Sequence, residues 1–396
     1  METVCNNNKC NGCMSCLDIC PREAIHIEKS LKSYNAHIDM EKCIACGLCH
    51  NVCPNNASCL AHPPQMWCQG WSNDLEIRKN GSSGGVATAL SLNFIRNGGY
   101  VCSCVFNDGK FGFVITADEK DLANFSGSKY IKSDAIGIYS KVFTLLQRGE
   151  KVLFIGLPCQ VAGMVNYAKF KRNDKNLYTV DLICHGTQSP MFLDMFLSQY
   201  GVLAKNCDNI GFRVKDSFQI NDNSRTFSSV GVCDRYMTAF LSALNYTDNC
   251  YRCQFAKKER VSDITLGDSW GSNCDSNEWK KGVSLILCQS DKGEELLSQS
   301  NLHLFDVDLD NAIAHNHQLS TPSIAPKSRA KFFRDIEKGM NFNGAVKRAL
   351  PKECIKQDFK ALLIKLHILP RAAGGGRVTY QVIICLLYTS PRPRDA

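Results

Sequence analysis

The sequence has no long hydrophobic run and no evenly spread excess of charge. No apolar stretch approaches the roughly 18 residues that a membrane-spanning helix needs. Residues 1–9 are polar and lack the apolar centre of a signal peptide. Hydrophobic residues make up 44% and charged residues 21%, a globular balance that excludes collagen-like, coiled-coil and disordered chains. We therefore expect a cytoplasmic protein of two or three domains with no membrane span.

The net charge of +8 is concentrated at one end of the chain. Residues 322–396 contain 15 Lys and Arg against 5 Asp and Glu, so the remainder is close to neutral. A near-neutral body gives no reason to expect nucleic-acid binding. We interpret the basic stretch as the solvated face of helices that pack on the main domain or on a partner.

Two common nucleotide-binding patterns are also missing. The Gly-rich segment 80–85 is not followed by Lys-Ser or Lys-Thr, so it is not a Walker loop. No G-x-G-x-x-G follows a strand, which argues against a conventional nicotinamide site. The segment does precede an expected helix over 86–96, whose free amides suit a phosphate. Ser82 and Ser83 serve equally well as plain N-caps of that helix.

Cysteine, in contrast, is abundant: there are 23, and 11 of them lie in the first 68 residues. In a reducing compartment, regularly spaced cysteines hold metal more often than they form disulfides. Two runs share the spacing C-x2-C-x2-C-x3-C-P. They are Cys10, Cys13, Cys16, Cys20 and Pro21, then Cys43, Cys46, Cys49, Cys53 and Pro54.

This spacing is that of bacterial ferredoxins with two 4Fe-4S clusters, in which the fourth Cys of each run binds the other cluster. We therefore predict one cluster on Cys10, Cys13, Cys16 and Cys53, and a second on Cys43, Cys46, Cys49 and Cys20. Zinc is disfavoured because its sites pair two C-x2-C motifs. The repeat covers residues 5–62, with a strand-like stretch after each run, at 24–28 and 56–60. Cys5, Cys59 and Cys68 are left as expected non-ligands.

Alternating α and β signals begin after the cysteine-rich region. Residues 151–156 (KVLFIG) and 177–184 (LYTVDLIC) predict buried strands, with a helix over 160–170 between them. This is the size of one βαβ unit, so both strands should be parallel. Their carboxyl ends would then lie at one sheet edge, where ligand sites form. That edge carries Cys159 and Cys184.

A further pair, Cys250 and Cys253, sits in a loop ahead of the basic stretch 257–260. With Cys159 and Cys184 it supplies four thiolates, and we predict a third 4Fe-4S cluster on them. Two alternatives stay open at this point. Spacing alone does not separate zinc from iron–sulfur here, and free cysteines are also common as small buried apolar residues.

The second domain resembles the coenzyme F-420 hydrogenase/dehydrogenase beta-subunit family. The resemblance covers about half the chain, and these stretches carry it: residues 83–85 (SGG), 129–133 (KYIKS), 156–163 (GLPCQVAG), 180–186 (VDLICHG), 250–253 (CYRC), 260–271 (RVSDITLGDSWG) and 282–285 (GVSL). Two positions depart from the usual pattern, Leu157 for a frequent Thr and Ser269 for a frequent aromatic residue. Neither departure removes a thiolate.

The resemblance implies an FAD, a nearby 4Fe-4S cluster and an oxidoreductase role. The flavin contacts that it implies are Ser82, Ser83, Gly84, Gly85, Tyr130, Ser133, Asp268 and Trp270. His185, beside a cysteine ligand, is the candidate catalytic residue, although a structural histidine bonded to a backbone carbonyl is the plainer reading. Asp268 could instead cap a turn, and Trp270 could belong to the core.

The sequence thus predicts an α/β (α+β) protein: a ferredoxin-like dicluster domain (1–64), then a larger α/β flavin-binding domain with a partly parallel sheet (65–321). A basic helical segment (322–373) and a flexible tail that we expect to be non-native (374–396) follow. The predicted function is an iron–sulfur flavoprotein oxidoreductase that acts on a deazaflavin or another small organic substrate. Its expected partners are a redox protein, such as a ferredoxin, and a small hydride donor or acceptor. The alternatives are an electron-transfer subunit without its own substrate and a zinc-stabilised binding module.

Overall fold

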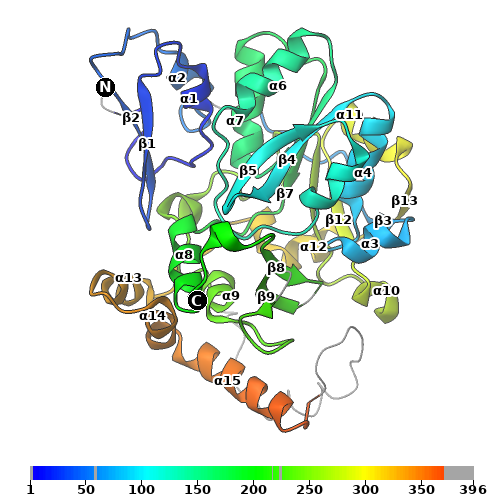
Figure 1. The fold of residues 1–396 in the computed structure, drawn as a ribbon. Helices are drawn as coiled ribbons and strands as arrows, with labels where there is room; N and C mark the ends of the chain where they lie inside the picture. Colours follow the sequence, from blue (N-terminus) through cyan, green and yellow to red (C-terminus); the bar gives the residue numbers. More distant parts are fainter. Residues whose placement is uncertain (1–2, 58–59, 216, 223–224, 370–396) are drawn as a thin grey trace.

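An eight-stranded sheet carries the body of the protein (Figure 1). The computed structural model describes residues 3–57, 60–215, 217–222 and 225–369. The strand order is β13-β3-β12-β11-β7-β6-β4-β5, parallel from β11 to β4 and antiparallel towards both edges. This confirms the predicted α/β class with a partly parallel sheet. The strands are β3 (Met66–Ser72), β4 (Tyr100–Asn107), β5 (Lys110–Thr116), β6 (Val152–Gly156), β7 (Leu177–Leu182), β11 (Ile264–Asp268), β12 (Ser284–Cys288) and β13 (Leu302–Phe305).

The central βαβ unit forms as the hydrophobic pattern predicts. All five residues of β6 are buried, as expected for a parallel strand covered on both faces. β6 and β7 pair in parallel from Val152 opposite Leu177 to Gly156 opposite Asp181. The connecting helix α7 (Pro158–Phe170) begins two residues earlier than predicted. Pro158 suits a first helical turn, and the Gln160 side chain accepts a hydrogen bond from the Leu157 N–H at 3.0 Å.

Helices cover both faces of this sheet. Three of them carry a buried apolar stripe that packs on it, α4, α6 and α11. The bounds of the helices near the sheet are α3 (Leu75–Asn80), α4 (Val86–Arg96), α5 (Leu122–Phe125), α6 (Ile138–Gln147), α10 (Ser276–Lys280), α11 (Asp291–Gln299) and α12 (Leu309–His315).

A second, smaller layer adjoins the main sheet. The strands β8 (Gly211–Val214), β9 (Ser217–Asp222) and β10 (Arg225–Thr226) form an antiparallel sheet. This sheet is separate from the main one. An aromatic core that includes Phe192, Tyr236 and Phe332 joins this layer to five helices, of which the last three are C-terminal. These helices are α8 (Pro190–Ser198), α9 (Arg235–Leu241), α13 (Arg329–Glu337), α14 (Phe342–Ala349) and α15 (Pro351–Lys365).

The N-terminal module consists of the hairpin β1 (Ile25–Lys29) and β2 (Tyr34–Ile38) with two five-residue helices, α1 (Ser15–Ile19) and α2 (Leu48–Val52). The strand expected at 24–28 is β1. Of the strand expected at 56–60, residues 58 and 59 lie outside the described residues, and Asn56 and Ala57 are not in a strand because the chain turns after Cys53. The Asn56 N–H donates to the Cys53 carbonyl at 3.0 Å, and the Asn56 side chain donates to the Val4 carbonyl at 2.6 Å. These bonds hold the segment as a turn.

None of the helices in the described part of the chain is long and apolar enough to cross a membrane. The predicted tail 374–396 and Cys59 lie outside the described residues.

The N-terminal module docks on helices α6 and α7 (Figure 1). The Asp18 carboxylate accepts hydrogen bonds from the backbone N–H groups of Gly137 (2.7 Å) and Tyr139 (2.9 Å). These amides begin α6, whose N-cap residue Gly137 has no side chain to offer. The Tyr139 hydroxyl donates in return to the Cys13 carbonyl at 2.6 Å. A carboxylate of one module therefore caps a helix of the other.

We expect Asp18→Ala to weaken this docking by about 1–2 kcal/mol, the usual cost of losing a helix N-cap. The measurement is the urea midpoint for loss of cluster absorbance. Glu41→Ala, which removes an exposed carboxylate of the same module, is the control. Equal midpoints for the two variants would contradict a capping role for Asp18.

Candidate functional site

The two cysteine runs of the N-terminal module adopt the same local shape. Each passes through two left-handed residues, Gly12 and Met14 in the first run and Ala45 and Gly47 in the second, with φ between 52° and 72°. Each then makes a five-residue helix that ends at its fourth cysteine in extended conformation. Left-handed residues curl a chain tightly, so both runs wrap a small volume. The predicted pseudo-two-fold repeat is therefore present in the backbone.

Backbone amides point at the cysteine sulfurs in both runs. The Gly12 N–H donates to Cys10 Sγ and the Ala45 N–H to Cys43 Sγ, both at 3.4 Å. Hydrogen bonds of this kind favour the thiolate over the thiol and tune cluster potentials. Their recurrence at matching positions suits metal-bound sulfur.

The cysteines are grouped across the repeat, as the crossed assignment requires. One cavity is lined by Cys20 of the first run together with Cys43, Cys46 and Cys49 of the second. Cys53 of the second run is buried in one cluster with Cys10 and Cys16 of the first. The structure also places the Cys5 thiol against Cys10 and Cys53, although its spacing gave no reason to include it. Cys68 lies apart, in β3.

The second cysteine set also comes together. Cys159 lies in the first turn of α7, Cys184 follows β7, and the other two flank Tyr251 and Arg252 in a short 3-10 helix. All four cysteines, Cys159, Cys184, Cys250 and Cys253, line one cavity. Within the described residues, no three His, Cys, Asp or Glu side chains converge as ligands of a single metal ion do. A 4Fe-4S cubane, by contrast, binds each thiolate at a different iron, so its cysteines surround a volume.

The surroundings of this cavity fit an anionic metal centre. Burial raises the pKa of the Cys184 thiol to about 12 and the pKa of Cys159 well above its usual value, so both need a metal to become thiolates. Two buried cations, Lys132 and Arg260, lie on the cavity wall. Arg260 Nη1 is buried without a hydrogen bond, and its nearest carboxylate oxygen, on Asp181, lies 3.6 Å away. A bound sulfur would satisfy such an orphaned donor.

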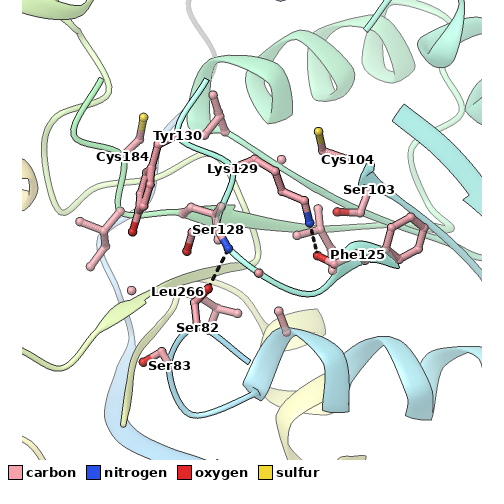
Figure 2. A pocket seen from close by; sticks show the side chains of 18 of the residues that line it. Ser82, Ser83, Ser103, Cys104, Phe125, Ser128, Lys129, Tyr130, Cys184 and Leu266 are labelled. Atoms are coloured by element: carbon pink, nitrogen blue, oxygen red, sulfur yellow. Dashed lines mark hydrogen bonds between the residues drawn. The ribbon is translucent and has the colours of Figure 1, made fainter. Parts of the chain in front are cut away.

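A larger cavity of about 260 Å³ adjoins the first (Figure 2). The two share a wall, residues 184–187, which carries Cys184 and His185. The large cavity lies at the carboxyl ends of β6, β7 and β11, where ligand sites of open α/β sheets form. It is lined by most of the predicted flavin contacts, namely Ser82, Ser83, Gly85, Tyr130, Ser133, Asp268 and Trp270. Gly84 is not among them, because its N–H donates to Ser284 Oγ at 3.0 Å.

The Gly-rich loop ahead of α4 presents amides instead of hydroxyl caps. The N-cap of α4 is Gly85, with φ of 78° and no side chain to cap the helix. Ser82 Oγ accepts from the Ser128 N–H at 2.7 Å (Figure 2), and Ser83 Oγ donates to the Val283 carbonyl at 2.8 Å. The alternative that these serines are plain N-caps is therefore wrong. The first amides of α4 stay available to an anion.

A buried arginine and a half-buried lysine hold the carbonyls of this loop. Arg213 Nη2 donates to the Ser82 carbonyl at 3.0 Å. Lys215 Nζ donates to the carbonyls of Gly81 (2.8 Å) and Ser83 (3.0 Å). The cations turn the carbonyls away and add positive charge, and both effects favour an anion at the amides. Both come from the segment around β8, where no sequence motif marked them.

The remaining predicted residues have definite partners. Asp268 neither caps a turn nor stands free, because it pairs with Arg213 at 2.7 and 3.2 Å. Tyr130 accepts a hydrogen bond from Arg213 at 3.0 Å, and Ser133 accepts one from Gln160 at 3.0 Å. The Trp270 ring packs on Trp279, with ring centres 6.0 Å apart.

His185 is a neutral imidazole in this environment. Burial, and to a lesser extent the nearby His317, lower its pKa to about 4. Its Nδ1 lies 2.9 Å from the Gln318 amide nitrogen, so Nδ1 accepts and Nε2 carries the proton. The partner of His185 is therefore a side-chain amide, not the backbone carbonyl expected for a purely structural histidine.

Three family models match the chain. The model "Coenzyme F420 hydrogenase/dehydrogenase, beta subunit N-term" matches residues 67–138, and the corresponding C-terminal model matches residues 149–304. A 4Fe-4S dicluster domain model matches residues 9–57. A chain from the F420-reducing [NiFe] hydrogenase complex of Methanosarcina barkeri is 17% identical, with a TM-score of 0.45 over 71% of this chain and 97% of that one. No curated protein matches significantly.

The crossed grouping gives a test of the N-terminal ligands. We expect Cys20→Ala to abolish the cluster held by the second run, and Cys53→Ala to abolish the one held by the first. The measurement is electron paramagnetic resonance of each reduced variant, compared with Cys43→Ala and Cys10→Ala. Cys20→Ala should match Cys43→Ala, and a match to Cys10→Ala instead would refute the crossed assignment.

Proposed function

Because this chain belongs to the coenzyme F420 hydrogenase/dehydrogenase beta-subunit family, we propose that it is an iron–sulfur flavoprotein oxidoreductase. It would couple one-electron transfer through three 4Fe-4S clusters to hydride chemistry at FAD, with a deazaflavin or another small organic molecule as substrate. The observation that carries the proposal is the wall shared by the four-cysteine cavity and the large cavity, which contains Cys184 and His185.

The chain's own residues divide into three roles under this proposal. The N-terminal cysteines hold two clusters, and Cys159, Cys184, Cys250 and Cys253 hold the third. Clusters carry single electrons and a flavin exchanges hydride, so the protein must position them and set their potentials. The amides at the start of α4 would bind the cofactor's pyrophosphate, with Arg213 and Lys215 behind the loop. His185 would donate a hydrogen bond from Nε2.

The space at the site suits a dinucleotide. Another cavity, of about 560 Å³, lies across the loop 126–129. It shares Thr88, Lys129 and Arg213 with the cavity of about 260 Å³ that the predicted flavin contacts line. Its wall also carries Asn80, Asn209 and Asn221, whose amides suit ribose and adenine. We propose that the flavin ring occupies the more apolar cavity and the adenosine half the other.

A second candidate function is an electron-transfer subunit without its own substrate, and a zinc-stabilised binding module is a third. The partner in the second case would be a redox protein. Turnover of a reduced deazaflavin or of ferredoxin by the isolated chain supports the first candidate over the second. Flavin and acid-labile sulfide in the purified protein exclude the third.

The third cluster is tested by iron content. Three clusters require about 12 irons per chain and the N-terminal runs alone about 8. We expect Cys184→Ser and Cys253→Ser to leave about 8 irons after anaerobic reconstitution, since each removes one of four ligands. Cys274→Ser, which changes a cysteine outside the three sets, is the matched control and should keep about 12. A wild-type protein with flavin but only about 8 irons would overturn the third cluster.

The phosphate-binding loop is tested through Lys215. We expect Lys215→Met to lower flavin occupancy at least severalfold with iron content unchanged, because the loop carbonyls lose the cation that holds them. Lys292→Met is the matched control, since Lys292 Nζ also donates to a backbone carbonyl, that of Leu177 at 2.9 Å, but lies outside both cavities. Equal flavin occupancy in the two variants would contradict the role of Lys215.

A further inference from the structure

Lys132 lies between the N-terminal module and the four-cysteine cavity. Its ammonium donates to the Asn11 carbonyl at 2.9 Å, inside the first cysteine run, and sits 5.2 Å from the centre of the Tyr34 ring. The same residue lines the cavity that contains Cys159. Gly12 makes this approach possible, because a Cβ there would come within 2.8 Å of the Tyr34 ring and 3.2 Å of Lys132 Cδ.

This ammonium is buried without a carboxylate partner. Lys132 is 5% exposed, and none of the ion pairs among the described residues includes it. A buried cation without a counter-ion is costly, so a negative charge is expected close to it. The Asn11 carbonyl that it binds lies between Cys10 and Cys13 in the sequence, and Cys159 lines the same cavity as Lys132. Three neutral thiols supply no such charge.

We propose that Lys132 is a positioning residue shared by two anionic iron–sulfur centres, one on the Cys10 run and one in the Cys159 cavity. The inference rests on the proposed function, because it assigns those centres to the two cysteine sets. A fixed positive charge between them stabilises the reduced, more negative state of each, so it raises both reduction potentials. When one electron passes between the centres, one is oxidised and the other reduced.

The test compares Lys132→Gln, which removes the charge at similar size, with Lys132→Arg, which keeps it. Potentiometric titrations followed by electron paramagnetic resonance give the potential of each cluster, with iron and flavin counted in parallel. The control is Lys32→Gln, since the Lys32 ammonium pairs with Glu337 at 2.7 Å on the surface. We expect Lys132→Gln to shift two of three potentials to more negative values, with the third and the flavin content unchanged.

The same change made in a variant that lacks one cluster shows which clusters the shifts in potential belong to. In Cys253→Ser, which lacks the third cluster under the proposal, Lys132→Gln should move only one of the two remaining potentials. Lys132→Arg should restore the wild-type values. If Lys132→Gln instead loses iron from these two centres while Lys132→Arg retains it, the charge is needed to hold them, which also supports the inference.

Two outcomes overturn it. The first is that Lys132→Gln keeps all the iron with unchanged potentials. The second is that both variants lose the iron equally, because the lysine side chain would then be needed only for its shape. A wild-type protein with only about 8 irons is a different result. It refutes the third cluster of the proposed function, so the iron content of the wild-type protein is measured before any Lys132 variant is made.

Discussion

The parallel pairing of β6 and β7 is the constraint on which both cavities depend. It places the ends of the two strands at one sheet edge, so that Cys159 at the start of α7 meets Cys184 beyond β7. β11 joins the same parallel set and adds Asp268 to the large cavity. The two cavities are adjacent because the residues after β7 form a wall of each. Any change in the order of these strands would separate the cysteines from the proposed flavin site.

Buried and half-buried positive charge distinguishes this edge of the sheet. Lys132 and Arg260 lie at the four-cysteine cavity, and Arg213 and Lys215 stand behind the Gly-rich loop. Arg213 pairs closely with Asp268 at 2.7 Å and Arg260 more loosely with Asp181 at 3.6 Å, whereas no ion pair among the described residues includes Lys132 or Lys215. Burying cations is costly, and a protein that collects them at two adjoining cavities is suited to anionic ligands. An iron–sulfur centre and a dinucleotide pyrophosphate are both anions, so the same physical argument supports both parts of the proposal.

Local sequence patterns predicted helices and strands, but they carry no information on contacts between residues that are far apart in the chain. The apolar runs of β6 and β7 are local features, and the structure forms both strands as predicted. The cysteine spacing is local too, and the cysteines of each set lie near one another, while their roles as ligands stay predictions. Arg213 reaches Ser82 from a different sheet, and Lys132 reaches Asn11 from a different module. No period or spacing links such pairs. The turn at Asn56 depends on a hydrogen bond from its side chain to the Val4 carbonyl, and the sequence around Asn56 gives no sign of this distant partner.

The pseudo-symmetry of the N-terminal module raises the question of which half faces the main domain. Met14 and Asp18 of the first run correspond by spacing to Gly47 and Asn51 of the second. Met14 Sδ accepts from the Ala135 N–H at 3.4 Å, and Asp18 caps α6, whereas Gly47 offers no side chain and an uncharged Asn51 interacts less favourably with a helix dipole. Both halves contact α7, through α1 and α2, but only the first half places a carboxylate at the start of α6. The first run faces inward, towards Cys159, and Cys46 of the second stays exposed. Under the proposed function, the cluster on the first run would lie nearer the four-cysteine cavity, and the cluster on the second run would lie nearer solvent.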